Sequence, residues 1–240
     1  MKRRRRRRRL TFTAAAALCF LLLAAVKLSP LPARQHALLT ADTAPVQTEQ
    51  MVQAADTADG WALVLVNAQH GLPDDFSVEL TLLSNGESVD TRMYPALQQM
   101  FDDMRVQGVY PTVNEGFRTR EDQQAILDDK IAAYLAQGYS YDAARELALD
   151  YVAVPGTSEH ELGLAVDVTA DKTLCTNDTV YAWLAENAYR YGFVLRYPAD
   201  KESVTGIAYE PWHYRYVGTQ AAQTIHEQGL CLEEYLGTTA

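Results

Sequence analysis

Two short segments, about fifty residues apart, carry side chains of the kind that hold a catalytic metal ion. Together they supply two imidazoles, one carboxylate, and a second carboxylate three residues before the second imidazole. Three protein ligands leave a fourth zinc position open for water, and a spare carboxylate can accept that water's proton. A fold for this chain must therefore bring both segments to one place. The residues concerned are His160, Asp167, Glu210 and His213.

The five histidines of the chain are not equivalent. A single histidine is more often exposed or locally paired than a metal ligand. His36, His70 and His226 have no acidic or histidine partner at a ligand-like spacing, whereas the other two lie in densely patterned segments. The number of histidines therefore restricts a metal site to His160 and His213.

The spacing within the first segment also constrains the backbone. His160 and Asp167 are seven residues apart, so on one regular strand they would face opposite sides of a sheet. Gly163 lies between them and permits a turn or bulge that redirects the chain. We therefore expect His160 on a loop and Asp167 on a buried strand over residues 164–168.

The two segments, S-x-H-x-x-G-x-A-x-D at 158–167 and E-x-W-H at 210–213, resemble zinc D-alanyl-D-alanine carboxypeptidases of the VanY type. That family belongs to the wider group of lysostaphin, D-Ala-D-Ala metallopeptidases and Sonic hedgehog. The resemblance spans about residues 61–236 and includes G-F-R-T at 116–119. It implies an α+β fold in which helices flank a small antiparallel sheet.

The resemblance assigns a role to each site residue. It implies one Zn²⁺ per chain, bound by His160, Asp167 and His213. Glu210 would be the general base and then the proton donor to the leaving amine, with Glu159 and Glu161 as the next candidates. The substrate-contacting residues that the resemblance implies are Arg118 for the oxyanion and Ser158 and Gln123 for the terminal carboxylate. Trp212 is an equally good candidate for substrate contact and for core packing.

Arg118 has a simpler interpretation from its neighbours alone. Glu121 and Asp122 follow it closely, so the residues by themselves favour a surface salt bridge. The motif match favours the functional role instead, because a guanidinium offers several fixed donors to an oxyanion.

The implied activity is removal of the C-terminal D-alanine from peptidoglycan stem peptides or their precursors. An L,D-carboxypeptidase that trims tetrapeptides would share the same metal ligands and is the nearest alternative. A cell-wall binding module that keeps the zinc fold without catalysis is the alternative of another class. Glu210 argues against it, because a structural zinc site needs no spare base.

The N-terminal region differs sharply from the rest of the chain. Residues 1–9 form a basic head with eight charges, and removing them leaves 13 basic against 31 acidic residues, which disfavours nucleic-acid binding. Residues 10–28 are predominantly apolar and predict a single-pass signal-anchor in the bacterial cell membrane, with the head in the cytoplasm. Residues 29–59 predict a flexible stalk, and residues 60–240 the extracytoplasmic catalytic domain. A cleaved, secreted form is the alternative.

Periodicity and turn residues predict the elements of the catalytic domain. Strands are expected at 61–67, 109–115, 192–195 and 209–216, and helices at 90–106, 120–136, 141–151, 178–191 and 219–228. Thr119 with Asp122, and Ser140, are expected to cap two of these helices, and Gly229 to end the last one. Residues 198–205 read as a hairpin or loop. Cys175 and Cys231 lie in the exported part, where either a disulfide or two free thiols is compatible with the sequence.

Overall fold

A computed structural model describes residues 60–238, so the predicted head, anchor and stalk lie outside the described residues. The main sheet has four antiparallel strands in the spatial order β3-β4-β6-β5. Its strands are β3 (Pro111–Glu115), β4 (Ala165–Ala170), β5 (Phe193–Leu195) and β6 (His213–Tyr216). A separate antiparallel pair consists of β1 (Leu80–Leu82) and β2 (Ser88–Asp90). The expected α+β class with a small antiparallel sheet is confirmed.

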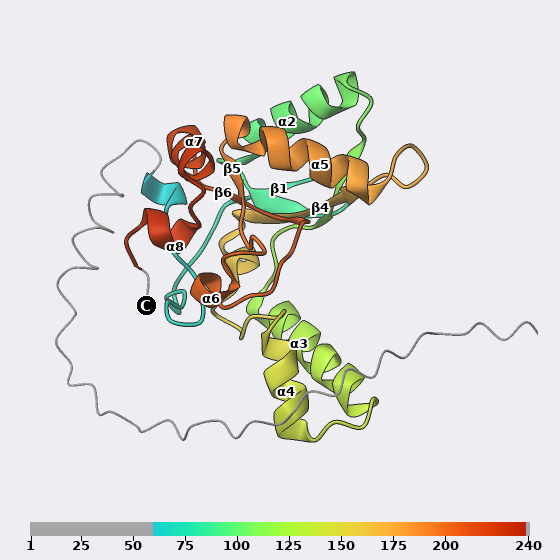
Figure 1. The fold of residues 1–240 in the computed structure, drawn as a ribbon, viewed down its shortest axis with the longest axis vertical. Helices are drawn as coiled ribbons and strands as arrows, with labels where there is room; N and C mark the ends of the chain where they lie inside the picture. The colour runs from blue at the N-terminus through green and yellow to red at the C-terminus, as the bar shows by residue number, and fades with distance from the viewer. Residues whose placement is uncertain (1–59, 239–240) are drawn as a thin grey trace, which may run out of the picture. The chain divides into compact units, whose positions relative to one another are not determined.

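Helices lie on both sides of this sheet (Figure 1). None of those within residues 60–238 is both long enough and apolar enough to cross a membrane. The α-helices are α2 (Tyr94–Val106), α3 (Arg120–Leu135), α4 (Tyr141–Leu149), α5 (Asn177–Asn187), α6 (Glu202–Thr205), α7 (Thr219–Gln228) and α8 (Leu232–Tyr235). The 3-10 helices are η1 (Gly60–Ala62), η2 (Glu159–Leu162) and η3 (Ala188–Tyr191).

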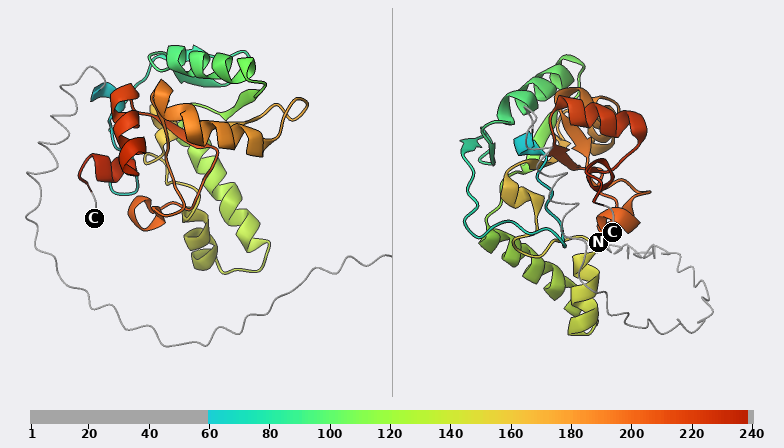
Figure 2. Two further views of the ribbon diagram at one scale, coloured as in Figure 1. Left: turned by 45° about the horizontal axis from the view of Figure 1, so that its top comes forward. Right: turned by 90° about the vertical axis from the view of Figure 1, so that its left-hand side faces the viewer.

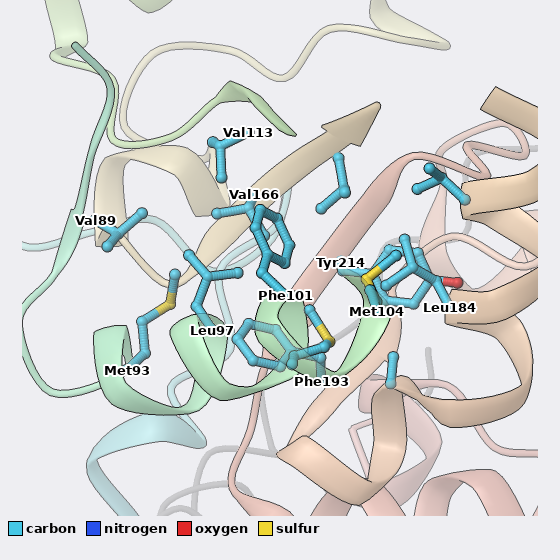
Figure 3. Close-up of a cluster of buried hydrophobic side chains, with 14 of the residues drawn as sticks. Val89, Met93, Leu97, Phe101, Met104, Val113, Val166, Leu184, Phe193 and Tyr214 are labelled. Carbon is cyan, nitrogen blue, oxygen red and sulfur yellow. The ribbon is translucent and has the colours of Figure 1, made fainter. Parts of the chain in front are cut away.

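The largest hydrophobic cluster lies between one face of the sheet and helices α2 and α5. Leu97, Phe101 and Met104 recur along α2 at helical spacing and are buried against the strands. Figure 3 shows these side chains beside Val166 of β4 and Tyr214 of β6. One face of the sheet therefore packs against the hydrophobic core.

Strand alternation places polar residues on the opposite face. Val166 and Val168 of β4 point into the core, so Asp167 between them points to the other side. Tyr214 of β6 also points into the core, and His213 precedes it on the strand. The two metal-ligand candidates on the sheet therefore share the face that α2 and α5 do not cover.

Helices α3 and α4 form a hairpin that projects away from the sheet (Figure 2). The hairpin has its own small apolar cluster, which includes Leu127 and Ile131. Thr119 caps α3 in the predicted capping box with Asp122, and Ser140 caps α4 by accepting from the Ala143 amide. Gly229 ends α7 in a left-handed conformation, as predicted.

The strand predicted over residues 61–67 is wrong. The segment begins in η1 and then runs on without a strand, because the carbonyl oxygens of Ala62 and Val64 each accept a hydrogen bond of 2.8 Å from Arg215. Backbone acceptors that a ladder would need are thus bound to a buried side chain. The loop predicted over residues 198–205 contains the single helical turn α6.

The two described cysteines are free thiols, which excludes the disulfide alternative for this structure. Cys175 lies beside β3, where its sulfur accepts from the Tyr110 amide at 3.3 Å. Cys231 is buried at the start of α8, where burial raises the pKa of its thiol to about 11.

Candidate metal centre

The turn before β4 presents His160 to the sheet. His160 lies on η2, and Gly163 ends η2 with φ of 73°, a left-handed conformation that favours glycine. The chain then enters β4, which carries Asp167. The predicted strand with Asp167 is confirmed, although it spans Ala165–Ala170, whereas His160 lies on a short 3-10 helix and not on the predicted loop.

Strand pairing brings the second segment to the first. Asp167 of β4 and His213 of β6 are directly opposite each other in the antiparallel register. Side chains of such a pair share one face of the sheet at close range. His160 reaches the same place from η2, whose backbone accepts a 3.2 Å hydrogen bond from the Arg118 amide.

The three candidate ligand atoms converge on one point. Asp167 Oδ1 lies 3.4 Å from His160 Nε2 and 3.2 Å from His213 Nδ1. Each of the three residues offers one ligand atom, and these three atoms lie within 4.8 Å of one another. Ligands bound to a tetrahedral zinc at 2.0–2.1 Å lie about 3.3–3.4 Å apart, so these separations fit that ion. Asp167 Oδ1 is also buried with no hydrogen-bond partner among the described residues, as expected for an atom that binds a metal.

The two imidazoles face Asp167 with different ring nitrogens. His160 Nδ1 lies 2.7 Å from the carbonyl oxygen of Gly116, which leaves Nε2 facing Asp167. A side chain at residue 116 would collide with the backbone of Ser88, so glycine lets these two backbone segments lie close together. His213 faces Asp167 with Nδ1 instead, and the ring of Tyr197 lies 4.8 Å from its own.

The electrostatics of Asp167 favour a cation. Burial alone would raise the pKa of this carboxyl, but the imidazoles of His160 and His213 outweigh burial and hold it well below its ordinary value. The carboxylate is therefore ionised at neutral pH and available to a metal ion.

Glu210 lies beside the ligand cluster on the segment that leads into β6. Its Oε2 is 3.7 Å from His213 Nδ1, and its side chain is one-tenth exposed. Burial raises the pKa of Glu210 to about 7, and nearby Asp167 contributes, while His213 and Arg118 oppose the rise. A carboxyl group with a pKa near 7 can both accept and return a proton at physiological pH.

Arg118 faces the same pocket from the junction between β3 and α3. Its Nε donates to Glu115 at 3.1 Å, and its Nη1 donates to Gln123 Oε1 at 2.6 Å. The salt bridge to Glu121 or Asp122 that the sequence alone favoured is wrong. Asp122 instead accepts from the Thr119 hydroxyl at 2.7 Å, which commits it to the helix cap.

The pocket beside the metal ligands is small. Its volume is about 120 Å³, well below the roughly 300–1,000 Å³ of sites for drug-sized ligands. The structure brings all eight predicted site residues to its walls, where they are joined by Tyr151, Tyr197 and Ile207. Such a volume suits the small end of a peptide.

The three residues predicted to contact the substrate differ in their burial and in their hydrogen bonds to the protein. Gln123 is buried, and its Nε2 donates to the Ala153 carbonyl at 2.7 Å while its Oε1 holds Arg118. This glutamine therefore orients the arginine. Ser158 is buried at the pocket wall, and Trp212 is half-buried there rather than part of the main hydrophobic cluster.

Sequence reasoning missed a buried ion-pair network behind His213. Glu159, considered only as a substitute base, is fully buried and bonded to Arg196 and Arg215. This pairing makes it unsuitable as the base, and Glu161 is likewise engaged by the Gly156 amide at 2.8 Å. The available signal was alternation: Arg215 is two residues after His213 on one strand and must share its face.

Comparisons with known proteins identify the family of the chain. The family model described as "VanY: D-alanyl-D-alanine carboxypeptidase" matches residues 86–219. A D-alanyl-D-alanine carboxypeptidase of Enterococcus faecalis (strain ATCC 700802 / V583) is 50% identical over 219 residues, covering 90% of this chain and 82% of that protein.

Solved structures of VanY proteins are also similar to this chain. VanYB in complex with D-alanine-D-alanine is 57% identical, with a TM-score of 0.73 over 74% of this chain and 98% of that one. A variant of the vancomycin resistance D,D-pentapeptidase VanY from a VanB-type cassette, in complex with Zn(II), is also 57% identical, with a TM-score of 0.72 over 73% of this chain and 99% of that one. The chain belongs to the VanY family of D-alanyl-D-alanine carboxypeptidases.

Proposed function

We propose that this protein is a zinc-dependent D,D-carboxypeptidase that removes the C-terminal D-alanine from peptidoglycan stem peptides or their precursors. The observation that carries the proposal is the convergence of three ligand atoms with Glu210 and Arg118 at one small pocket. His160, Asp167 and His213 are the proposed zinc ligands. Relatives named for the D,D-activity at 50% and 57% identity support this choice over the L,D-activity.

When bound there, zinc supplies a Lewis acid that lowers the pKa of water and polarises a carbonyl. Glu210 supplies the proton transfers. Its carboxylate accepts the proton of the attacking water, and the resulting carboxylic acid then donates it to the amine of the departing D-alanine. The pKa of about 7 suits both steps.

Arg118 supplies fixed positive charge at the carbonyl that is attacked. Glu115 and Gln123 hold its Nε and one terminal nitrogen, so the guanidinium is oriented before substrate arrives. A preorganised donor of this kind stabilises an oxyanion without reorganising during the reaction. Ser158 and Trp212 are the proposed contacts to the end of the peptide, because they line the same pocket. Gln123, also expected to contact the peptide, lines this pocket too, but its hydrogen bond to Arg118 favours a role through the arginine.

We also propose that residues 10–28 anchor the protein in the bacterial membrane. The basic head at residues 1–9 would remain in the cytoplasm, and the catalytic domain would lie outside it. The stalk at residues 29–59 would let the domain reach substrate at a distance from the bilayer. A cleaved and secreted form would meet the same substrates.

The test is release of D-alanine from UDP-MurNAc-pentapeptide and UDP-MurNAc-tetrapeptide by the full-length chain in detergent. The proposal expects zinc-dependent release from the pentapeptide and little from the tetrapeptide. A preference for the tetrapeptide would favour the L,D-carboxypeptidase. Binding of either peptide without release, by zinc-loaded protein, would favour the non-catalytic module.

A further inference from the structure

Glu159 has two oxygens in different environments. Its Oε1 accepts hydrogen bonds of 2.8 Å from both Arg196 Nε and Arg215 Nη1. Its Oε2 has no hydrogen-bond partner among the described residues and lies 3.6 Å from His213 Nε2. That nitrogen is also buried and unpartnered. Two buried polar atoms without other partners therefore face each other behind the metal ligand.

The two histidines of the site have different supports. His160 turns its non-ligating nitrogen to a neutral carbonyl, that of Gly116. His213 turns its non-ligating nitrogen to the carboxylate of Glu159. Histidines that bind metals generally donate their second ring N–H to a carboxylate or carbonyl, which fixes the ring and strengthens it as a ligand.

We propose that Glu159 is a positioning residue for the metal site, holding the His213 ring through its Nε2–H so that Nδ1 faces the ion. Arg196 and Arg215 fix the carboxylate so that Oε2 remains directed at the imidazole. The inference rests on the proposed function, because it requires His213 to be a zinc ligand.

The support extends to both ends of the described chain. Arg196 also donates to both carboxylate oxygens of Glu233 on α8, at 2.9 and 2.6 Å. Arg215 also donates to the carbonyl oxygens of Ala62, the last residue of η1, and Val64, which follows it. The buried set contains two carboxylates and two guanidiniums, so its formal charges balance. Contacts from α8 and from the segment at Ala62 and Val64 therefore help to hold Glu159, and through it the proposed ligand His213.

The test replaces Glu159 by glutamine in the full-length chain and measures zinc affinity by competition with a chelator. Arg196 and Arg215 both donate to the Oε1 position, so the amide oxygen should settle there. The amide NH₂ would then face His213 Nε2–H, placing two donors against each other. We expect zinc affinity to fall about 10–100-fold, the range seen when such a support is removed.

A matched control is available on the same turn. Glu161 is buried on η2, where it pairs with Arg120 at 3.5 Å and accepts from the Gly156 amide. Within the described residues its carboxylate forms no ion pair with either histidine of the site, so Glu161→Gln should leave zinc affinity unchanged. The visible spectrum of the cobalt-substituted Glu159→Gln protein should also change, because the geometry of a ligand is altered. A merely structural role would lower stability without changing that spectrum.

A second variant keeps the test valid if Glu159→Gln does not fold. Glu159→Asp keeps the charge beside the arginines but is shorter by one methylene, so it should fold and still bind zinc less tightly than the wild type. Wild-type zinc affinity in folded Glu159→Gln, or in Glu159→Asp if the first variant does not fold, overturns the inference. His213→Ala separates the two claims: wild-type affinity in that variant refutes the ligand assignment itself, whereas its loss leaves only the role of Glu159 in question.

Discussion

Replacing Glu210 by glutamine should stabilise the metal-free protein while removing its activity. The ordinary carboxyl value of 4.5 is raised by burial to a pKa of about 7, so the folded state disfavours the ionised form. At 1.36 kcal/mol per pKa unit, ionised Glu210 should destabilise the fold by about 3 kcal/mol. Glutamine has the same shape and no charge, and it should therefore recover most of this free energy.

The stability gained by Glu210→Gln should increase as the pH rises. Below pH 4.5 the carboxyl is protonated in both the folded and unfolded states and contributes no penalty. The penalty grows as pH rises toward 7 and is complete above it. At pH 8 the variant should melt about 6–12 °C above the wild type, the shift expected for about 3 kcal/mol in a domain of this size.

The assay is thermal unfolding of the full-length chain with chelator at pH 5 and pH 8. Most of the difference should be absent at pH 5. Glu146→Gln, at an exposed position on α4, is the control and should melt with the wild type at both values. A melting temperature for Glu210→Gln that equals the wild type at pH 8 would refute the reasoning from burial. The zinc-loaded variant should lose at least ~100-fold in turnover.

Three further results are expected. Arg118→Ala should weaken transition-state binding by about 3 kcal/mol with little change in melting temperature. The control Arg120→Ala, at a half-exposed site, should leave kcat/KM near wild type. Wild-type kcat/KM in Arg118→Ala would contradict the oxyanion role. In a pH profile, kcat/KM should rise as Glu210 loses its proton, with a midpoint at or below 7 because a bound cation favours the carboxylate. A midpoint well above 8 would point to another base. Protease added to intact protoplasts should digest the catalytic domain, and its protection would reverse the proposed topology.

Local signals predicted the parts of the fold that depend on neighbouring residues. The capping box of Thr119 and Asp122 requires only four consecutive positions, and it forms as expected. Gly163 likewise marked a turn that its own backbone conformation explains. The candidate ligands were also found from local motifs, each within ten residues, although their convergence depends on the pairing of β4 with β6.

Contacts between distant segments were not predictable in this way. The irregular course of residues 61–67 depends on Arg215, about 150 residues later. The network of Glu159, Arg196 and Glu233 joins three elements whose proximity no local pattern reveals. The partner of Arg118 was missed because two carboxylates follow it in sequence, whereas the strand before it supplies the actual partner, Glu115.

The proposed metal ligands can be tested by the anomalous diffraction of zinc-loaded crystals, measured on both sides of the zinc absorption edge. We expect one peak per chain, about 2.0–2.2 Å from His160 Nε2, His213 Nδ1 and an Asp167 carboxylate oxygen. Glu210 should lie beside the ion without being one of its protein ligands. A zinc peak at another place, or one that includes Glu210 in place of Asp167, would contradict the assignment of ligands and base together.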